Sequence, residues 1–178
     1  IQSLFAKKNF SSKITFHELF KITQKHLIIN ATCLNTHDNT IFDHINTPDM
    51  PVLTAVCASM ALPFIFGSIN YNGLTYVDGG VLNNLLINLP LFSDCCENVL
   101  GINLDNQADY SVKNICTLDQ YCVNLFACLY NAYNKLSMIS SLSNRVGINI
   151  ININIPNVNA FNFTISNEEK LGLITLGY

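Results

Sequence analysis

Apolar positions along the chain form short continuous runs and helical repeats, which predicts a mixture of strands and helices. Between residues 114 and 144 apolar side chains recur every three or four positions, so this stretch is predicted to form one long helix or two. The apolar runs at 27–32 and 99–104 have the length and composition of buried strands. The other predicted helices are 15–23, 52–62, 88–94 and 166–178, and the other predicted strands are 40–44, 69–71, 74–77 and 147–155.

Two capping boxes mark helix starts. Thr15 stands three residues before Glu18, and Ser166 stands three residues before Glu169. At this spacing the hydroxyl accepts a hydrogen bond from the third helical N–H, while the carboxylate accepts one from the N–H of the capping residue. Both helices are therefore predicted to begin directly after the hydroxyl residue.

Prolines and a slip in alternation predict further boundaries. Pro51 favours the start of the 52–62 helix, and Pro63 is expected to end it because proline cannot continue the helical hydrogen-bond ladder.

In the 147–155 strand, isoleucine alternates with asparagine until Ile150 and Ile151 stand side by side. This slip predicts a β-bulge.

An Asn-Gly pair predicts a hairpin at the centre of the chain. Asn72-Gly73 tolerates the positive φ values of a type I′ turn, and it separates the strands at 69–71 and 74–77. The second of these strands leads directly into Asp78. The hairpin is therefore expected to place a carboxylate at the exit of a strand.

Asp78 is followed by Gly79 and Gly80, which permit a tight turn and the close approach of another segment or a ligand. This arrangement suits a catalytic carboxylate, and it equally suits an ordinary Asp-Gly turn. The apolar neighbours Tyr76 and Val81 would raise the pKa of the carboxyl group, as a general base requires. From the local sequence alone, both interpretations stay open.

Composition limits the number of domains and the kinds of partner that the chain can have. The chain has 178 residues, 49% of them hydrophobic, which suffices for one sizeable core and predicts a single domain. Only 12% are charged and the net charge is −3, which gives no support for a nucleic-acid groove. Residues 1–25 hold five lysines and one glutamate, a net charge of +4 that leaves −7 for the remainder. This basic segment could face anionic lipid headgroups, or it could form a solvated helix and loop.

Cysteine usage indicates a reducing compartment. The seven cysteines include no C-x-x-C pair and form an odd total, so neither a disulfide framework nor a zinc site is predicted. No two histidines have the i, i+4 spacing of a helical metal site, and each is interpreted as a surface or packing residue. We therefore expect an intracellular protein, cytoplasmic or peripheral to a membrane, with no metal.

No run of eighteen apolar residues occurs, so no transmembrane segment is predicted in this chain. Asparagine and isoleucine are frequent, and arginine occurs once, at Arg145. These preferences follow from AT-rich codons, so the expected source is a virus or an AT-rich microbe.

A longer motif surrounds the hairpin: Ala58-Ser59-x-Ala61-x-Pro63-x-x-Phe66, then Gly73, then Val77-Asp78-Gly79-Gly80-x-x-Asn83-Asn84. This block resembles the patatin-like phospholipase family, in which it lies near the end of the catalytic core. Residues 14–42 and 168–178 are similar to the parts of that family on either side of the block. The resemblance covers most of the chain and is weak between residues 106 and 159.

The resemblance implies a layered α/β/α sandwich and a Ser-Asp dyad. In the family the nucleophile is the serine of G-x-S-x-G, its partner is the aspartate of D-G-G or D-G-A, and a glycine-rich loop forms the oxyanion hole. Only the aspartate, Asp78, has a counterpart here, supported by Gly79 and Gly80. Leu86 also replaces a proline of the family pattern. Because the chain begins at Ile1 and not at methionine, residues 1–178 are interpreted as the C-terminal part of an incomplete domain whose nucleophile and oxyanion hole lie upstream.

Two functions follow from the resemblance. The first is a lipid acyl-ester hydrolase, of the phospholipase A type, that acts on phospholipid or neutral lipid at a membrane surface, uses no cofactor and takes part in lipid degradation. Asp78 would accept the proton of the serine. The second is a catalytically inactive descendant that keeps the fold as a lipid-binding or interaction module. The 178 residues alone are expected to show no hydrolysis.

Overall fold

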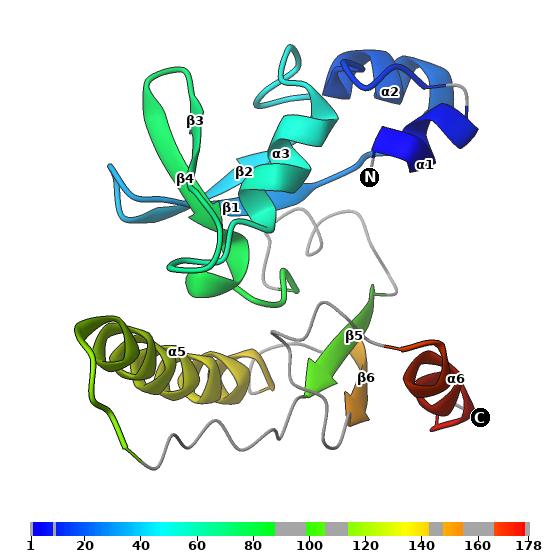
Figure 1. The fold of residues 1–178 in the computed structure, drawn as a ribbon. Coiled ribbons are helices and arrows are strands. Elements are labelled where there is room, and N and C mark those ends of the chain that lie inside the picture. Colours follow the sequence, from blue (N-terminus) through cyan, green and yellow to red (C-terminus); the bar gives the residue numbers. More distant parts are fainter. Residues whose placement is uncertain are drawn as a thin grey trace. The chain divides into compact units, whose positions relative to one another are not determined.

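A computed structural model describes residues 2–8, 10–87, 99–105, 114–142, 148–154 and 166–176. They form two compact units, one of residues 1–86 with 127–137 and one of residues 87–126 with 138–178. Helices and strands are mixed, which confirms the predicted α/β class (Figure 1). The assignment of residues 1–178 to one incomplete domain stays a prediction.

A four-stranded antiparallel sheet forms the centre of the first unit. Its strands are β1 (Ile29–Cys33), β2 (Asp38–Phe42), β3 (Ile69–Tyr71) and β4 (Leu74–Asp78), in the order β2-β1-β4-β3. The predicted Asn-Gly hairpin is confirmed as β3 and β4, which project together in Figure 1. The sheet therefore brings the end of β4 against β1, which lies more than forty residues earlier in the sequence.

The first two strands are shifted by two residues from their predicted positions. Leu27, predicted to begin the first strand, is exposed, and β1 begins at Ile29. The second strand ends at Phe42 because the Asp43 carboxylate accepts hydrogen bonds from the backbone N–H groups of the next turn. These bonds replace the sheet pairing that the prediction extended to His44.

Helix α3 (Val52–Ser59) packs against β1 and β4 and closes the core of this unit. It ends four residues before Pro63, so the predicted end at residue 62 was wrong. The backbone after Ser59 turns early, and the Ala61 carbonyl accepts a hydrogen bond from Asp78. The buried core consists of Phe16, Ala31, Cys33, Phe42, Met50, Val52, Ala55, Ala58 and Tyr76.

Two helices precede the sheet, α1 (Gln2–Lys7) and α2 (Phe16–Thr23). The predicted capping box of α2 is confirmed: the Glu18 N–H donates to Thr15 Oγ1, and the Thr15 N–H donates to the Glu18 carboxylate. Phe16, the first residue of α2, is buried in the core, so the cap fixes a helix that the core depends on.

In the second unit β5 (Val99–Asp105) and β6 (Ile148–Asn154) pair in parallel over their whole length. The predicted bulge at Ile150 and Ile151 was wrong, because the register runs through both residues without interruption. Their side chains lie on opposite faces of the sheet, as neighbouring strand residues do. Ile150 lies opposite Gly101 in the register, while Ile151 is exposed.

The remaining described helices are α5 (Leu118–Leu142) and α6 (Asn167–Leu176). The predicted long helix is thus a single one that begins four residues later than expected, and its residues belong to both units. The second capping box, of Ser166 and Glu169, is confirmed. The predicted helix at 88–94 lies outside the described residues. Across the described part of the chain, no helix has both the length and the hydropathy needed to cross a bilayer.

Candidate functional site

Asp78 is the last residue of β4, and backbone contacts on two sides fix its position. Its Cα is paired with that of Ala31 on β1. Its N–H donates to the carbonyl oxygen of Ala61 at 2.9 Å, in the segment that follows α3. The carboxylate is thus carried by the sheet and by the end of the helix that packs on it, which is a rigid support.

The Asp78 side chain caps a short 3₁₀ helix, η1 (Gly79–Val81). Its Oδ1 accepts a hydrogen bond from the Gly80 N–H at 2.6 Å. The residue is half-buried, and burial raises the pKa of its carboxyl group, while the Gly80 hydrogen bond acts in the opposite direction. Burial is the larger influence, so the pKa lies above its usual value of 3.8. A carboxylate with a raised pKa is a stronger base.

Close approach requires glycine at position 79, and neither Gly79 nor Gly80 has a positive φ, which among the described glycines occurs only at Gly73. A Cβ on Gly79 would lie 2.5 Å from the Cγ and Nδ2 of Asn30. A Cβ on Gly80 would lie 2.9 Å from Asp78 Oδ1. The close approach of another segment, which the sequence suggested, is thus observed at Gly79, where strand β1 passes.

Polar groups surround the Gly80 position. The point where a Cβ would stand lies 3.0 Å from Asn84 Oδ1 and 3.4 Å from the hydroxyl oxygen of Tyr130, on the part of α5 that belongs to the first unit. The carboxylate, an amide and a phenol therefore converge beside one glycine. Asn84 was part of the sequence motif, whereas nothing in the sequence indicated Tyr130.

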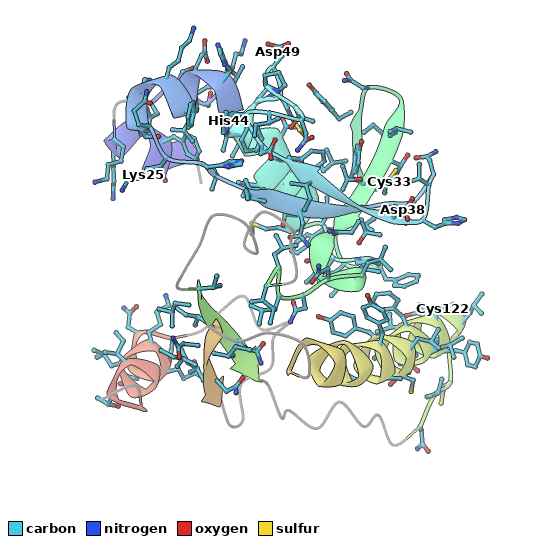
Figure 2. The ribbon with its side chains drawn as sticks, turned by 180° about the vertical axis from the view of Figure 1, so that it is seen from behind. Lys25, Cys33, Asp38, His44, Asp49 and Cys122 are labelled. Carbon is cyan, nitrogen blue, oxygen red and sulfur yellow. The ribbon has the colours of Figure 1, made fainter. Side chains whose placement is uncertain are left out.

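A second polar cluster lies between α2 and the end of β2. Asp43 is fully buried, and its Oδ2 lies 3.2 Å from the Nε2 atom of His26. The ring of His44 stacks on that of Phe20 with centroids 3.8 Å apart, beside α2 (Figure 2). These contacts agree with the interpretation of the histidines as packing residues. Within the described ranges no group of three His, Cys, Asp or Glu side chains could hold a metal ion.

The described cysteines are all free thiols: Cys33, Cys57, Cys116, Cys122 and Cys128. None of these five takes part in a disulfide. Only Cys33 is buried, within the core of the first unit. The candidate chemistry of the described residues therefore centres on Asp78.

Fold and site together define an α/β protein with a half-buried carboxylate at a strand end, held on a glycine turn. The sequence profile of the patatin-like phospholipase family matches residues 1–91, which include the whole first-unit sheet and the Asp78-Gly79-Gly80 turn. The chain belongs to the patatin-like phospholipase family.

Three relatives are similar in sequence to this chain. A probable lipid hydrolase of Invertebrate iridescent virus 6 is 42% identical over 84 residues, which are 47% of this chain and 29% of the relative. An uncharacterized protein of Acanthamoeba polyphaga mimivirus is 28% identical over 99% of this chain and 59% of its own length. An uncharacterized protein of Bacillus subtilis is 30% identical over 84% of this chain and 52% of its own length. The matched parts thus span 29% to 59% of the length of these relatives.

Proposed function

We propose that this chain is the aspartate-bearing part of a serine acyl hydrolase that cleaves fatty-acyl esters of phospholipids or neutral lipids. The observation that carries the proposal is the carboxylate of Asp78, half-buried at the end of β4 and held by Gly80. Membership of the patatin-like family and similarity to a viral protein named a probable lipid hydrolase support a lipid substrate.

The proposed chemistry is acyl transfer through a Ser-Asp dyad. A serine Oγ attacks the ester carbonyl carbon while Asp78 takes the hydroxyl proton. The bond to the alcohol then breaks, and Asp78 returns the proton to the departing oxygen. Water attacks the acyl-enzyme in the same way and releases the fatty acid. The Gly80 N–H engages one carboxylate oxygen, and proton transfer needs only the other.

The setting of this activity belongs to the same proposal. A lipid hydrolase meets its substrate at a membrane surface, so the protein would act as a peripheral membrane protein. The odd number of cysteines and the lack of a C-x-x-C pair in the sequence support a reducing compartment.

A second candidate is a patatin-like module that binds lipid or a partner protein without catalysis. The 178 residues contain no G-x-S-x-G sequence, and this observation favours the second candidate. Retention of Asp78 with both glycines favours the first, because a binding module has no need of a partly desolvated carboxylate next to a capped turn.

Fluorophosphonate labelling of the native gene product separates the two candidates. The reagent phosphonylates an activated serine, and intact mass with peptide mapping then locates the adduct. We expect one label on a serine of a G-x-S-x-G motif outside these 178 residues, and we expect it to be lost in the Asp78→Asn variant. A product that takes no label would overturn the proposal in favour of the binding module.

A further inference from the structure

Asn30, on β1, lies directly beneath the turn that carries the candidate base. It precedes Ala31, whose Cα is paired with that of Asp78. Its side chain is half-buried, and its backbone carbonyl oxygen would lie 2.6 Å from a Cβ on Gly79. Strand β1 thus passes under the turn so closely that only a glycine fits at position 79.

The Asn30 carboxamide uses its two N–H bonds to join three segments. Nδ2 donates to the carbonyl oxygen of Asn83 at 2.9 Å and to Oδ1 of Asn39, on β2, at 3.3 Å. The Asn83 N–H in turn donates to the Gly79 carbonyl at 2.9 Å. Asn83 closes the turn that Asp78 opens, so Asn30 holds the far end of that turn to the sheet.

An amide is the side chain that this position requires. A carboxylate would offer no donor to the Asn83 carbonyl, and a hydrocarbon would leave that half-buried carbonyl without the bond from Nδ2. The amide also lies close to Gly79, since its Cγ and Nδ2 would each lie 2.5 Å from an added Cβ. Asn30 and Gly79 are therefore complementary in both shape and hydrogen bonding.

We propose that Asn30 is a positioning residue for Asp78. Its side-chain amide clamps the 78–83 turn to β1 through the hydrogen bond to the Asn83 carbonyl. This inference rests on the proposed function of Asp78 as the base of the dyad. The described side-chain hydrogen bonds of Asn30 go to Asn83 and Asn39 and not to the Asp78 carboxylate. Asn30 acts through the turn, because a carboxylate displaced by about 1 Å transfers a proton far less efficiently.

The first test uses the native gene product and needs no catalysis. The Asp78 carboxyl carbon and the Gly80 amide are followed by NMR during a pH titration of the wild type and of the Asn30→Ala variant. Without the clamp the turn opens to water, so we expect the titration midpoint of Asp78 to fall toward that of an ordinary aspartate. We also expect the response of the Gly80 amide to weaken. Unchanged signals in a folded variant would overturn the proposal.

The second test measures turnover of a fluorogenic fatty-acyl ester by the native gene product. The Asn30→Ala variant is expected to lower kcat roughly 10- to 100-fold with KM nearly unchanged, as misplacement of a catalytic group does. The matched control is Asn70→Ala. Asn70 is exposed on β3, and the one described hydrogen bond of its side chain is the bond it accepts from the Thr75 hydroxyl. Equal loss in both variants would overturn the proposal.

The titration and the turnover assay distinguish failure of the proposed function from failure of the proposed role of Asn30. If the wild-type product hydrolyses no ester, the proposed function fails, while the titration still decides whether Asn30 places Asp78. If the Asn30→Ala chain does not fold, Asn30→Cys replaces it, because cysteine is a small side chain whose thiol is only a weak donor to the Asn83 carbonyl. A normal Asp78 titration and normal kcat in Asn30→Cys would overturn the role of the clamp.

Discussion

At the scale of single residues, the ionised Asp78 side chain should lower the stability of the folded state. Its folded-state pKa is raised, chiefly by burial, so above its unfolded pKa the ionised side chain disfavours the folded state. Replacement by Asn removes that charge and keeps the shape. We expect Asp78→Asn to abolish turnover of the native gene product and to leave Tm at pH 7 equal to that of the wild type or higher.

The control for Asp78→Asn is Asp38→Asn. Asp38 is exposed at the turn that joins β1 to β2 (Figure 2), and there a lost charge should change neither turnover nor Tm. Thermal unfolding followed by circular dichroism, together with ester hydrolysis, checks both variants. An Asp78→Asn product that keeps most of its activity would exclude Asp78 as the base.

Gly79 should tolerate no side chain at all. The Cβ of Gly79→Ala would meet Asn30 atoms at 2.5 Å, and one neighbour is a backbone oxygen in a central strand that cannot move away cheaply. We expect a loss of about 1–3 kcal/mol in the free energy of unfolding, the usual range for overpacking. Gly67→Ala is the matched control, because a Cβ there meets nothing within 4 Å. Equal urea midpoints for the two variants would contradict this close approach.

Asp43 makes the opposite contribution to stability from Asp78. Burial alone would raise the pKa of its carboxyl group, but hydrogen bonds from Asn46, His26 and Ile45 outweigh burial and lower it below 3.8. A lowered folded-state pKa stabilises the folded state above the unfolded pKa, and this contribution is lost as the pH falls through the folded pKa. We expect Asp43→Asn to be destabilising at pH 7 and the difference from wild type to shrink below about pH 4. Urea unfolding at pH 7, 5 and 3 measures this, and a constant difference would refute it.

At the scale of elements, the two capping boxes should differ in their effect on stability. Thr15→Ala removes the cap of α2, whose first residue is buried in the core, so we expect a loss of about 0.5–2 kcal/mol in the global free energy of unfolding. Ser166→Ala removes the same bond from α6, whose described side chains are exposed. That loss should fray α6 locally and leave the urea midpoint unchanged. A shift of the midpoint by Ser166→Ala would show that α6 supports the core.

Local signals explain which elements could be predicted from the sequence. The capping boxes and the Asn72-Gly73 turn depend on residues within four positions of one another, and the structure has them as predicted. The end of α3 was mispredicted from Pro63, because the chain turns earlier to present the Ala61 carbonyl to Asp78. The bulge in β6 was mispredicted because strict alternation assumes one buried face, and β6 places isoleucines on both faces.

The residues of the candidate site likewise differ in whether local sequence could identify them. Asp78, Gly79 and Gly80 are contiguous, so a motif could identify them. Asn30 approaches Gly79 from a strand 49 positions earlier, and only the pairing of β1 with β4 brings the two together. No periodicity or spacing within one segment contains that information, and the same is true of Tyr130 beside Gly80.

At the scale of the whole molecule, the two units differ in how their sheets are covered. β1 lies between β2 and β4, beneath α3, and its residues Ala31 to Cys33 are at most 3% exposed. On β5 the alternate residues Leu100, Ile102 and Leu104 are 56–61% exposed. Parallel strands are normally covered on both faces, so an open apolar face marks a region of low local stability.

Hydrogen exchange should therefore separate the two sheets. The hydrogen bonds that protect the β1 amides break only when the core of the first unit unfolds, whereas those of the β5 amides break in a local opening. In native-state exchange at pH 7 we expect the slowest β1 amides to exchange at least about 100-fold more slowly than those of β5. Equal protection would contradict this expectation, and it would mean that the apolar face of β5 and β6 is covered in solution. Repeating the measurement with lipid vesicles and over a range of protein concentrations would then show whether lipid or a second copy of the chain covers it.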